Sequence, residues 1–517
     1  MISGARIGQS TWLRRLVARA ESHALTAFVV PGAAIIRAHG LALTAAGLSV
    51  APSPRHASVL VVIGDLPDGL VGPTAVVYAQ MARPRAILCI GTVRAASLPA
   101  PDVAIGIDQS ALNVGVADLR RRFAAGAWVA DADADAFEVA EQQDAMDHKG
   151  HDQHMMQHDA HDGMAMDMDM DMDMSGGFMS MVAMTQDLPR SSDGLPMEWS
   201  EAPFGPLFSG LPGGLALTLT LDGDTVMQAK VTPGAVHRGL AADWPGPALS
   251  FPDRLALLDP LSPVAYRVLA SRALEHAAAV KPDVAMERHR VGALERERAV
   301  SHLSWFADFA ALLGDRWLAG RAEELQVALM RATDERSVIR VGREIAAFVG
   351  RVERIPFLKL RLNGIGYDTS HTSETVRGPF ARASGLSVDA RLDEPIYRAL
   401  GFVPVTDDGR DAWARFQVRL GELTQSMDLI RAVGTATLPD PPALTIGSGE
   451  GEATVETPRG PATLHIVLQD RQVAEAHLDT PSARLVTLVP AMAAGRELAD
   501  ALIGIAALDL SPWEVDR

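Results

Sequence analysis

The sequence predicts two folded regions: a small N-terminal α/β domain with a parallel sheet, residues 1–130, and a larger α+β domain with a helical core, residues 193–517. Three observations support this fold class. Short apolar runs that end in glycine alternate with helical segments in the first region, strand patterns and long helical segments fill the last, and low-complexity sequence separates the two. A length of 517 residues also predicts more than one compact unit, at about 150 residues per domain.

The first region contains two buried-strand patterns. Residues 58–64 and 86–91 are continuous apolar runs, each ending in glycine, and residues 74–83 between them have helical periodicity. Strands covered on both faces read this way, so we expect a βαβ unit with parallel strands. The apolar run at residues 24–36 contains Pro31-Gly32 and is too short for ~30 Å of hydrocarbon, so we expect neither a signal peptide nor a membrane span there.

Residues 131–192 differ from both neighbours in composition. Residues 131–174 hold 14 acidic residues and one lysine, which account for −13 of the net charge of −17. High charge and low complexity predict a disordered acidic tether that builds no core. The remaining chain carries a charge of about −4 by difference, without the basic surface that nucleic-acid binding requires.

The tether also contains residues that bind metals. Thioether sulfur suits Cu(I), and imidazole suits Cu(II), zinc or nickel. Copper binding is therefore one hypothesis for the tether, and a plain solvated linker is the other. The candidate ligands are His148, His151, His154, His158, His161, Met155, Met156, Met166, Met168, Met170, Met172 and Met174.

The last region begins with a hairpin pattern and continues into helices. Residues 215–221 and 225–231 alternate around a predicted turn at Asp222-Gly223. Helical periodicity then covers residues 262–279, 286–313 and 322–332. Near the end, residues 452–455, 462–468 and 473–477 return to a strand pattern separated by turn residues.

Several motifs of the last region resemble one family in the same order. They are similar to the D-type, quinone-site subunit of respiratory complex I (NADH-quinone oxidoreductase), which is related to the large subunit of nickel-iron hydrogenases and to energy-converting hydrogenase complexes. The motifs are His237-Arg238-Gly239, Glu295 with Arg298 and Ser301-His302-Leu303, Gly364-Ile365-Gly366, Arg377-Gly378-Pro379, Pro458-Arg459-Gly460 and Glu514-Val515-Asp516-Arg517.

The first region resembles another component of the same complex. Residues 53–64 and 81–85, with Ile90-Gly91, are similar to its small B-type subunit, a flavodoxin-like domain that carries the terminal iron-sulfur cluster. The resemblance therefore implies a fusion of a B-like and a D-like subunit. In the family, a paired cysteine, a Gly-Ser-Cys and a further cysteine hold the cluster.

This chain departs from the family at the metal ligands. Gly32-Ala33-Ala34 and Gly91-Thr92-Val93 stand where the family has cysteines, and alanine, valine and threonine supply no ligand to an iron-sulfur cluster. The single cysteine, Cys89, falls within a predicted strand and is expected to be a small buried hydrophobe. We expect no iron-sulfur cluster held by this chain, and no nickel-iron centre because the Cys-x-x-Cys pairs are missing.

The quinone pocket implied by the resemblance also departs from the family. Phe208 and Pro212 take the places of histidines in a hairpin, and Leu257 takes the place of a tyrosine after Asp253-Arg254. Apolar side chains can line a cavity for an isoprenoid tail but cannot protonate a reduced quinone. Quinone binding and NAD binding are thus implied by family analogy alone.

A polar framework persists beside that pocket. Glu295, Arg298 and His302 stand at positions i, i+3 and i+7, on one face of a predicted helix. Together with His237 they are the candidate residues of a polar relay. The alternative, which we favour, is a satisfied structural network.

The resemblance implies a peripheral-arm component of a complex I-like assembly, attached to the cytoplasmic face of the inner membrane. Its expected partners are antiporter-like and other membrane subunits and further peripheral-arm subunits. The missing ligands favour a scaffold that has lost its own redox centre. Two alternatives stay open: an active NADH-quinone oxidoreductase component with a relocated quinone site, and a copper-binding or copper-sensing module built on the tether.

Overall fold

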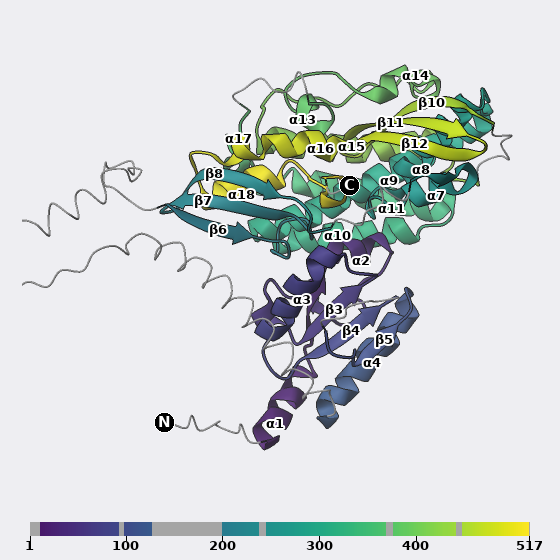
Figure 1. Cartoon of the computed structure of the whole chain (residues 1–517). Coiled ribbons are helices and arrows are strands. Elements are labelled where there is room, and N and C mark those ends of the chain that lie inside the picture. The colour runs from purple at the N-terminus through teal and green to yellow at the C-terminus, as the bar shows by residue number, and fades with distance from the viewer. Residues whose placement is uncertain are drawn as a thin grey trace, which may run out of the picture.

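The computed structural model describes residues 11–91, 98–126, 199–236, 244–368, 376–440 and 447–515. Figure 1 shows a small N-terminal domain, coloured purple to blue, beneath a larger domain coloured teal to yellow. Helix α2 lies at the top of the small domain, where the two meet. The predicted tether falls outside the described residues, so the structure leaves that prediction untested.

The small domain is built on a parallel sheet. Its strands lie in the order β2-β1-β3-β4-β5, and every neighbouring pair is parallel. This is the strand order of flavodoxin-like doubly wound folds. The predicted parallel sheet is therefore confirmed. The elements are α1 Thr11–Glu21, β1 Thr26–Val30, α2 Ala33–Ala38, β2 Ser49–Val50, β3 Val59–Ile63, α3 Asp68–Gln80, β4 Ala86–Ile90, β5 Val103–Ile105 and α4 Gln109–Ala125.

The apolar runs of this domain become its central strands. Every residue of β3 and β4 is buried, as expected for strands covered by helices on both faces. Residues 24–36 form strand β1 and the first turn of α2, with Pro31-Gly32 as the connection between them. The run is apolar because it crosses the core of the domain.

The larger domain combines a helical core with two antiparallel sheets. The first half contains β6 Ser200–Phe204, β7 Ala216–Asp222, β8 Thr225–Thr232, β9 Gly246–Pro247, α7 Phe251–Leu255, α8 Pro263–Ala277, α9 Val284–Leu313, α10 Arg316–Arg331, α11 Glu335–Val352 and α12 Leu358–Leu362. The second half contains α13 Pro379–Arg382, α14 Pro395–Ala399, α15 Ala412–Val433, β10 Gly449–Thr457, β11 Gly460–Gln469, β12 Gln472–Asp479, α16 Pro481–Leu485, α17 Val489–Ala493, β13 Arg496–Glu497, α18 Leu498–Ala506 and α19 Pro512–Val515.

The predicted hairpin is strands β7 and β8, with its turn shifted by one residue. Asp222 pairs with Thr225, so the two turn residues are Gly223 and Asp224 rather than Asp222-Gly223. Gly223 has a φ of 60°, which favours glycine. The sheet order is β13-β8-β7-β6, and the second antiparallel sheet has the order β10-β11-β12-β9.

Helix α9 is the centre of the larger domain. It begins at the N-cap Asp283, whose carboxylate accepts from the backbone N–H of Met286, and it ends at Gly314 in the left-handed conformation. Because α8, α10 and α15 all pack against it, α9 is buried on nearly every side for most of its 30 residues. The charged side chains of α9 therefore need buried partners.

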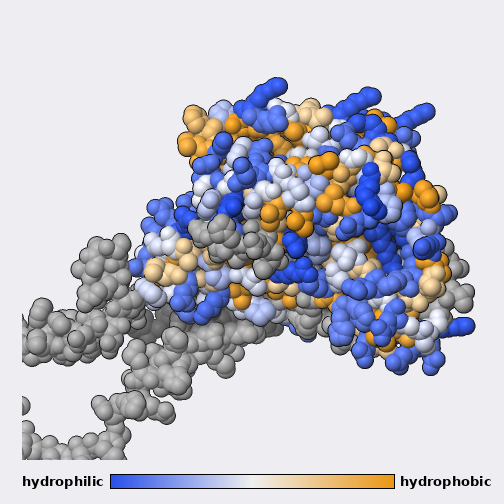
Figure 2. Space-filling view, turned by 90° about the horizontal axis from the view of Figure 1, so that it is seen from above, coloured by the Kyte–Doolittle hydropathy of each residue, from blue (hydrophilic) through white to orange (hydrophobic). Residues whose placement is uncertain are grey.

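The outer surface of the larger domain mixes polar and apolar residues. Seen from above in Figure 2, hydrophobic residues in orange lie interspersed with hydrophilic residues in blue. Phe357 and Leu360, at α12, are each 75% exposed. Scattered apolar side chains of this kind are common on protein surfaces and do not by themselves mark a binding face.

The two domains meet through α2, which packs against α9 and α10. Arg37 of α2 is 4% exposed and donates to Asp308 at 2.6 Å, Glu323 at 2.8 Å and Gln326 at 2.7 Å. Burial would lower the pKa of Arg37, but the two carboxylates outweigh it and raise this pKa, so the guanidinium stays charged. One arginine of the small domain is thus anchored to three side chains of the larger one.

Candidate functional site

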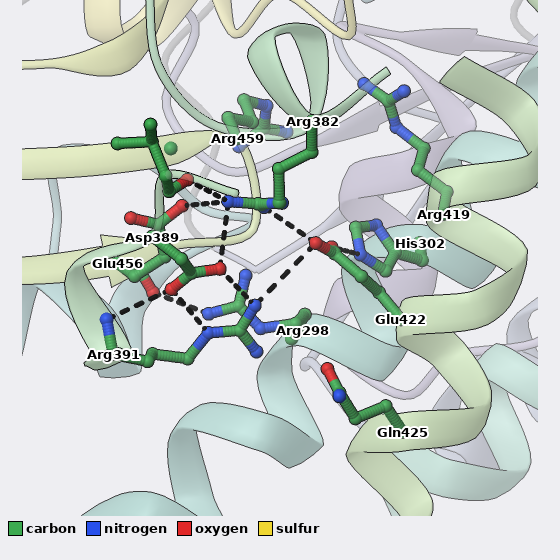
Figure 3. Close-up of polar contacts among 12 residues, drawn as sticks. Arg298, His302, Arg382, Asp389, Arg391, Arg419, Glu422, Gln425, Glu456 and Arg459 are labelled. Carbon is green, nitrogen blue, oxygen red and sulfur yellow. Dashed lines mark hydrogen bonds and ion pairs between the residues drawn. The ribbon is translucent and has the colours of Figure 1, made fainter. Parts of the chain in front are cut away.

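The framework predicted on α9 is the start of a buried ion-pair network. Glu295, Arg298 and His302 are at most 1% exposed, and Figure 3 shows the contacts of Arg298 and His302. Glu295 accepts hydrogen bonds from the Tyr397 hydroxyl and the Ser426 hydroxyl, each at 2.6 Å. His302 Nε2 lies 2.8 Å from a carboxylate oxygen of Glu422 on α15.

Arg298 contacts a different element from those that Glu295 and His302 contact. Its guanidinium donates to the backbone carbonyls of Glu456 at 2.7 Å and Thr457 at 2.9 Å, at the end of β10. The distance from its Nε to Glu295 is 3.4 Å. One face of α9 therefore holds both α15 and the β10–β11 sheet.

Two further arginines connect these elements, as Figure 3 shows. Arg382 on α13 lies 2.7 Å from Glu422, 2.8 Å from Glu456 and 2.9 Å from Asp389. Arg391 pairs with Asp389 at 2.7 Å and with Glu295 at 3.1 Å. All of these side chains are at most 1% exposed, so the attraction between them is not screened by water.

The pKa directions describe a network of fixed charges. Burial alone would raise the pKa of Glu422, but Arg382 and His302 outweigh it and hold this pKa well below its usual range. Burial alone would raise the pKa of Asp389. Arg391 and Arg382 outweigh this effect and lower the pKa to about 2. Burial lowers the pKa of His302, so its ring is neutral at pH 7. Carboxylates and guanidinium groups are thus locked together around a neutral imidazole.

This geometry suits the stabilisation of one packing arrangement. Removal of a single partner from a buried pair leaves an uncompensated charge, which typically costs about 3–5 kcal/mol. His302 Nδ1 is buried without a hydrogen-bond partner among the described residues. Whether Glu295, Arg298 and His302 form a polar relay or a structural network stays a prediction. The fourth candidate, His237, lies outside the described residues.

The three former quinone-pocket positions lie in different surroundings. Phe208 and Leu257 are exposed, by 37% and 60%, and Phe208 stacks edge-on against Phe204. Pro212 lines a cavity of about 50 Å³ between the domains. Neither Phe208 nor Leu257 lines this cavity.

The two domains approach each other closely beside that cavity. A Cβ atom on Gly213 would lie 1.8 Å from the carbonyl oxygen of Pro31, so only glycine fits there without movement of the backbone. Pro31 follows strand β1, at the carboxyl edge where doubly wound sheets bind ligands. The loop at residues 210–214, between β6 and β7, therefore occupies part of this edge.

The single cysteine is buried within the parallel sheet. Cys89 is a residue of strand β4, and the structure buries it among the apolar side chains on one face of the sheet. Burial raises the pKa of its thiol to about 11, so the thiolate is disfavoured at pH 7. Among the described residues no group of three or more histidine, cysteine, aspartate or glutamate side chains is arranged to hold a metal ion. The candidate copper ligands of the tether lie outside the described residues.

Several residues of the buried ion-pair network were not predicted from the sequence. Tyr397, Asp389, Arg391 and Glu456 come from short elements or strand ends, where no periodic pattern marks them. Asp389 caps a short 3-10 helix that contains Arg391, and only the fold brings Arg391 to Glu295 of α9 and Asp389 to Arg382 of α13.

Comparisons with known proteins relate this region to one family. Residues 318–445 match the family model described as the 49 kDa subunit of respiratory-chain NADH dehydrogenase. The D-type subunit of NADH-quinone oxidoreductase from Desulfotalea psychrophila is 27% identical over 356 residues, which cover 60% of this chain and 95% of that protein. Over about 60% of its length, this chain is a distant homologue of these 49 kDa, D-type subunits.

Further similarities extend to other D-type proteins. The D-type subunit of F420H2 dehydrogenase from Methanosarcina mazei is 26% identical over 365 residues, covering 60% of this chain and 96% of that protein. A chain of the membrane-bound sulfane sulfur reductase, an archaeal respiratory membrane complex, has the same fold over 62% of this chain and 99% of its own length. The TM-score is 0.56 at 23% identity. No helix in the described ranges is long and apolar enough to cross a membrane.

Proposed function

We propose that this chain is a D-like component of a respiratory membrane assembly, in which it acts as a scaffold without a redox centre of its own. Support for the setting comes from the relatives, which belong to NADH-quinone oxidoreductase, F420H2 dehydrogenase and a sulfane sulfur reductase complex. Support for the scaffold role comes from the residues at the edge where a B-type subunit would hold its cluster.

The observation that carries the proposal is the composition and packing of this edge. Gly32, Ala33 and Ala34 follow strand β1, and none has a side chain able to ligate iron. The cavity beside Gly32 measures about 50 Å³, and no cysteine is among the residues that line it. Gly32, Ala33 and Ala34 therefore offer no ligand to an iron-sulfur cluster, and we propose that no electron passes through this edge.

The second support is the buried network around Glu422. A relay residue needs a pKa near the working pH, whereas Arg382 and His302 hold the pKa of Glu422 well below its usual range. The network joins α9, α13, α15 and β10, so its contribution is to hold these elements in one arrangement. A scaffold needs this property.

We propose further that residues 11–126 act as a fused B-like partner. Arg37 already holds this domain to α9 and α10 through three hydrogen bonds. Joining two domains in one chain raises their effective concentration to about the millimolar range, so even a weakened interface stays assembled. Attachment to the membrane would then come through partner subunits.

An electron paramagnetic resonance spectrum of the purified assembly after reduction with dithionite tests the scaffold role. We expect any cluster signal to survive unchanged when this chain is replaced by a Cys89→Ala variant. We also expect quinone reduction by the assembly to be unaffected by that substitution. A signal or a turnover that depends on Cys89, or a cluster in the chain purified alone, would refute the scaffold proposal.

A further inference from the structure

A row of exposed arginines runs along helix α11 and continues just past its end. We call this row the arginine face. Its members are Arg336, Arg340, Arg343, Arg351 and Arg354. At 3.6 residues per turn, the four arginines within α11 lie inside an arc of about 80°. The buried apolar residues of the helix lie on the opposite side, so the arginine face points away from the core.

The arginine face has no counter-charges of its own. In the part of the chain that the structure describes, none of its five guanidinium groups forms an ion pair with a carboxylate. Two carboxylates of this region are engaged elsewhere. Asp334 caps α11 by accepting from the backbone N–H of Ser337 at 2.9 Å, and Glu344 pairs with Arg321 at 2.7 Å.

The spacing of these arginines is unfavourable for the helix by itself. Arg336 and Arg340 are four residues apart, a separation at which like charges destabilise a helix by about 0.2–0.5 kcal/mol per pair. The exposed arginines of α4 differ in this respect, because Arg121 and Arg122 both pair with Asp118. An anionic partner on the arginine face would remove the repulsion along α11.

The same chain contains a strongly anionic segment. Residues 131–174, which lie outside the described residues, hold 14 acidic residues and one lysine, a net charge of −13. Residues 335–361, from the start of α11 to α12, hold seven cations and three acids, a net charge of +4. The two segments are therefore complementary in charge.

The chain between the two domains is long enough for this contact. Met174 at the end of the acidic segment is 25 residues from Trp199, where the described part of the larger domain begins. Such a length spans at most ~80 Å. A domain of the size of residues 199–515 has a radius of gyration of ~20 Å and a diameter of ~50 Å. The acidic segment can therefore reach α11 without separation of the domains.

We propose that residues 131–174 dock on the arginine face of their own chain, with aspartate and glutamate carboxylates accepting hydrogen bonds from its guanidinium groups. Arginine binds a carboxylate through two parallel N–H donors, and several such pairs in a row form a network. Because the segment belongs to the same chain, its effective concentration at α11 is in about the millimolar range, and individually weak pairs suffice. This contact goes beyond the scaffold role and does not depend on it.

Carbodiimide crosslinking of the full chain, followed by mass spectrometry, tests the docking. The reagent joins a carboxylate directly to a lysine amine, and Arg343→Lys places such an amine in the arginine face without a change of charge. Lys230 of β8 is the internal reference, because it lies in the same sheet as β6, close in sequence to the end of the tether. We expect residues 131–174 to be joined to the amine of the variant roughly fivefold more often than to Lys230. Equal yields overturn the proposal.

Two double variants, each combined with Arg343→Lys, separate the arginine face from a general effect of charge. Arg336→Gln with Arg340→Gln should lower the yield at the introduced lysine roughly threefold, since it removes two of the neighbouring ion pairs. Arg19→Gln with Arg398→Gln makes the same change in net charge at exposed positions of α1 and α14 and should leave the yield unchanged. An equal decrease in both double variants refutes the arginine face as the docking surface.

Salt and isotope labelling test the nature of the contact and its origin within one chain. At about 1 M salt the Debye length falls to ~3 Å, so the yield at the introduced lysine should fall to that at Lys230. A yield that is unchanged at this salt concentration contradicts docking through charge. In an equal mixture of unlabelled and nitrogen-15-labelled chains, we expect every such crosslink to join peptides of one label. Crosslinks between the two labels would show docking on a second copy and would overturn the proposal.

Discussion

Substitution of Glu297 by glutamine should change how the stability of the chain depends on pH. The carboxyl group is buried, and its pKa of about 8 in the folded chain compares with 4.5 for an unperturbed group. The folded state therefore binds more protons than the unfolded state between these values. Stability is fully present below about pH 4.5 and is lost as the pH rises through 8.

The size of the effect follows from the two pKa values. Each pH unit in this window removes up to about 1.4 kcal/mol, so the loss between pH 5 and pH 8 is about 3 kcal/mol. Glu297→Gln removes the ionisation, and its stability should not show this loss. At about 2 °C for each kcal/mol, the variant should gain roughly 6 °C in melting temperature on wild type over that range.

Thermal unfolding followed by circular dichroism at pH 5, 6, 7 and 8 measures this difference. Glu353→Gln, at an exposed position after α11, is the control and should track wild type at every pH. A constant offset between Glu297→Gln and wild type would show that the carboxyl group does not titrate in this window, and would refute the reasoning.

Three other predictions concern the domain contact and the tether. Arg37→Ala should weaken docking of the small domain by about 3 kcal/mol; after cleavage at a protease site placed within residues 131–192, the two parts should separate on gel filtration, whereas those of wild type should stay together. Gly213→Ala should also weaken docking of the small domain, because the new Cβ would clash with Pro31. The control Gly320→Ala has open space around its new Cβ, so it should be neutral or stabilising by up to about 1 kcal/mol. Equal melting temperatures for the two variants would contradict the close approach of Gly213 to Pro31. Titration of Cu(I) into a peptide spanning residues 144–184 should give tighter binding than to a version with every methionine replaced by leucine, and equal affinities would exclude thioether ligation.

Local patterns predicted the regular elements well. The apolar runs at residues 58–64 and 86–91 are β3 and β4, because a strand covered on both faces must be apolar throughout. The hairpin of β7 and β8 followed from alternation around turn residues, with an error of one position at the turn. Helix α10 begins six residues earlier than expected, at Arg316, where its N-cap Asp315 satisfies the backbone N–H of Leu318.

The candidate site was only partly predictable. Helical spacing placed Glu295, Arg298 and His302 on one face of α9, and the structure places all three in the network. Glu297 lies only two residues after Glu295, so it points away from them and toward the N-terminus of α8. Helical periodicity predicted a helix from residue 262, but nothing in the sequence indicates that its N-terminus packs against Glu297.

The sequence by itself determined the parallel sheet of the small domain, the helical core of the larger one and the lack of cysteine ligands at the family positions. These properties depend on residue type and on patterns within a few turns or one strand. Only the tertiary structure decided which buried charges pair and how Arg37 reaches Gln326 across the domain contact. Such contacts join residues up to 289 positions apart, and the distance between them is set by packing rather than by local sequence.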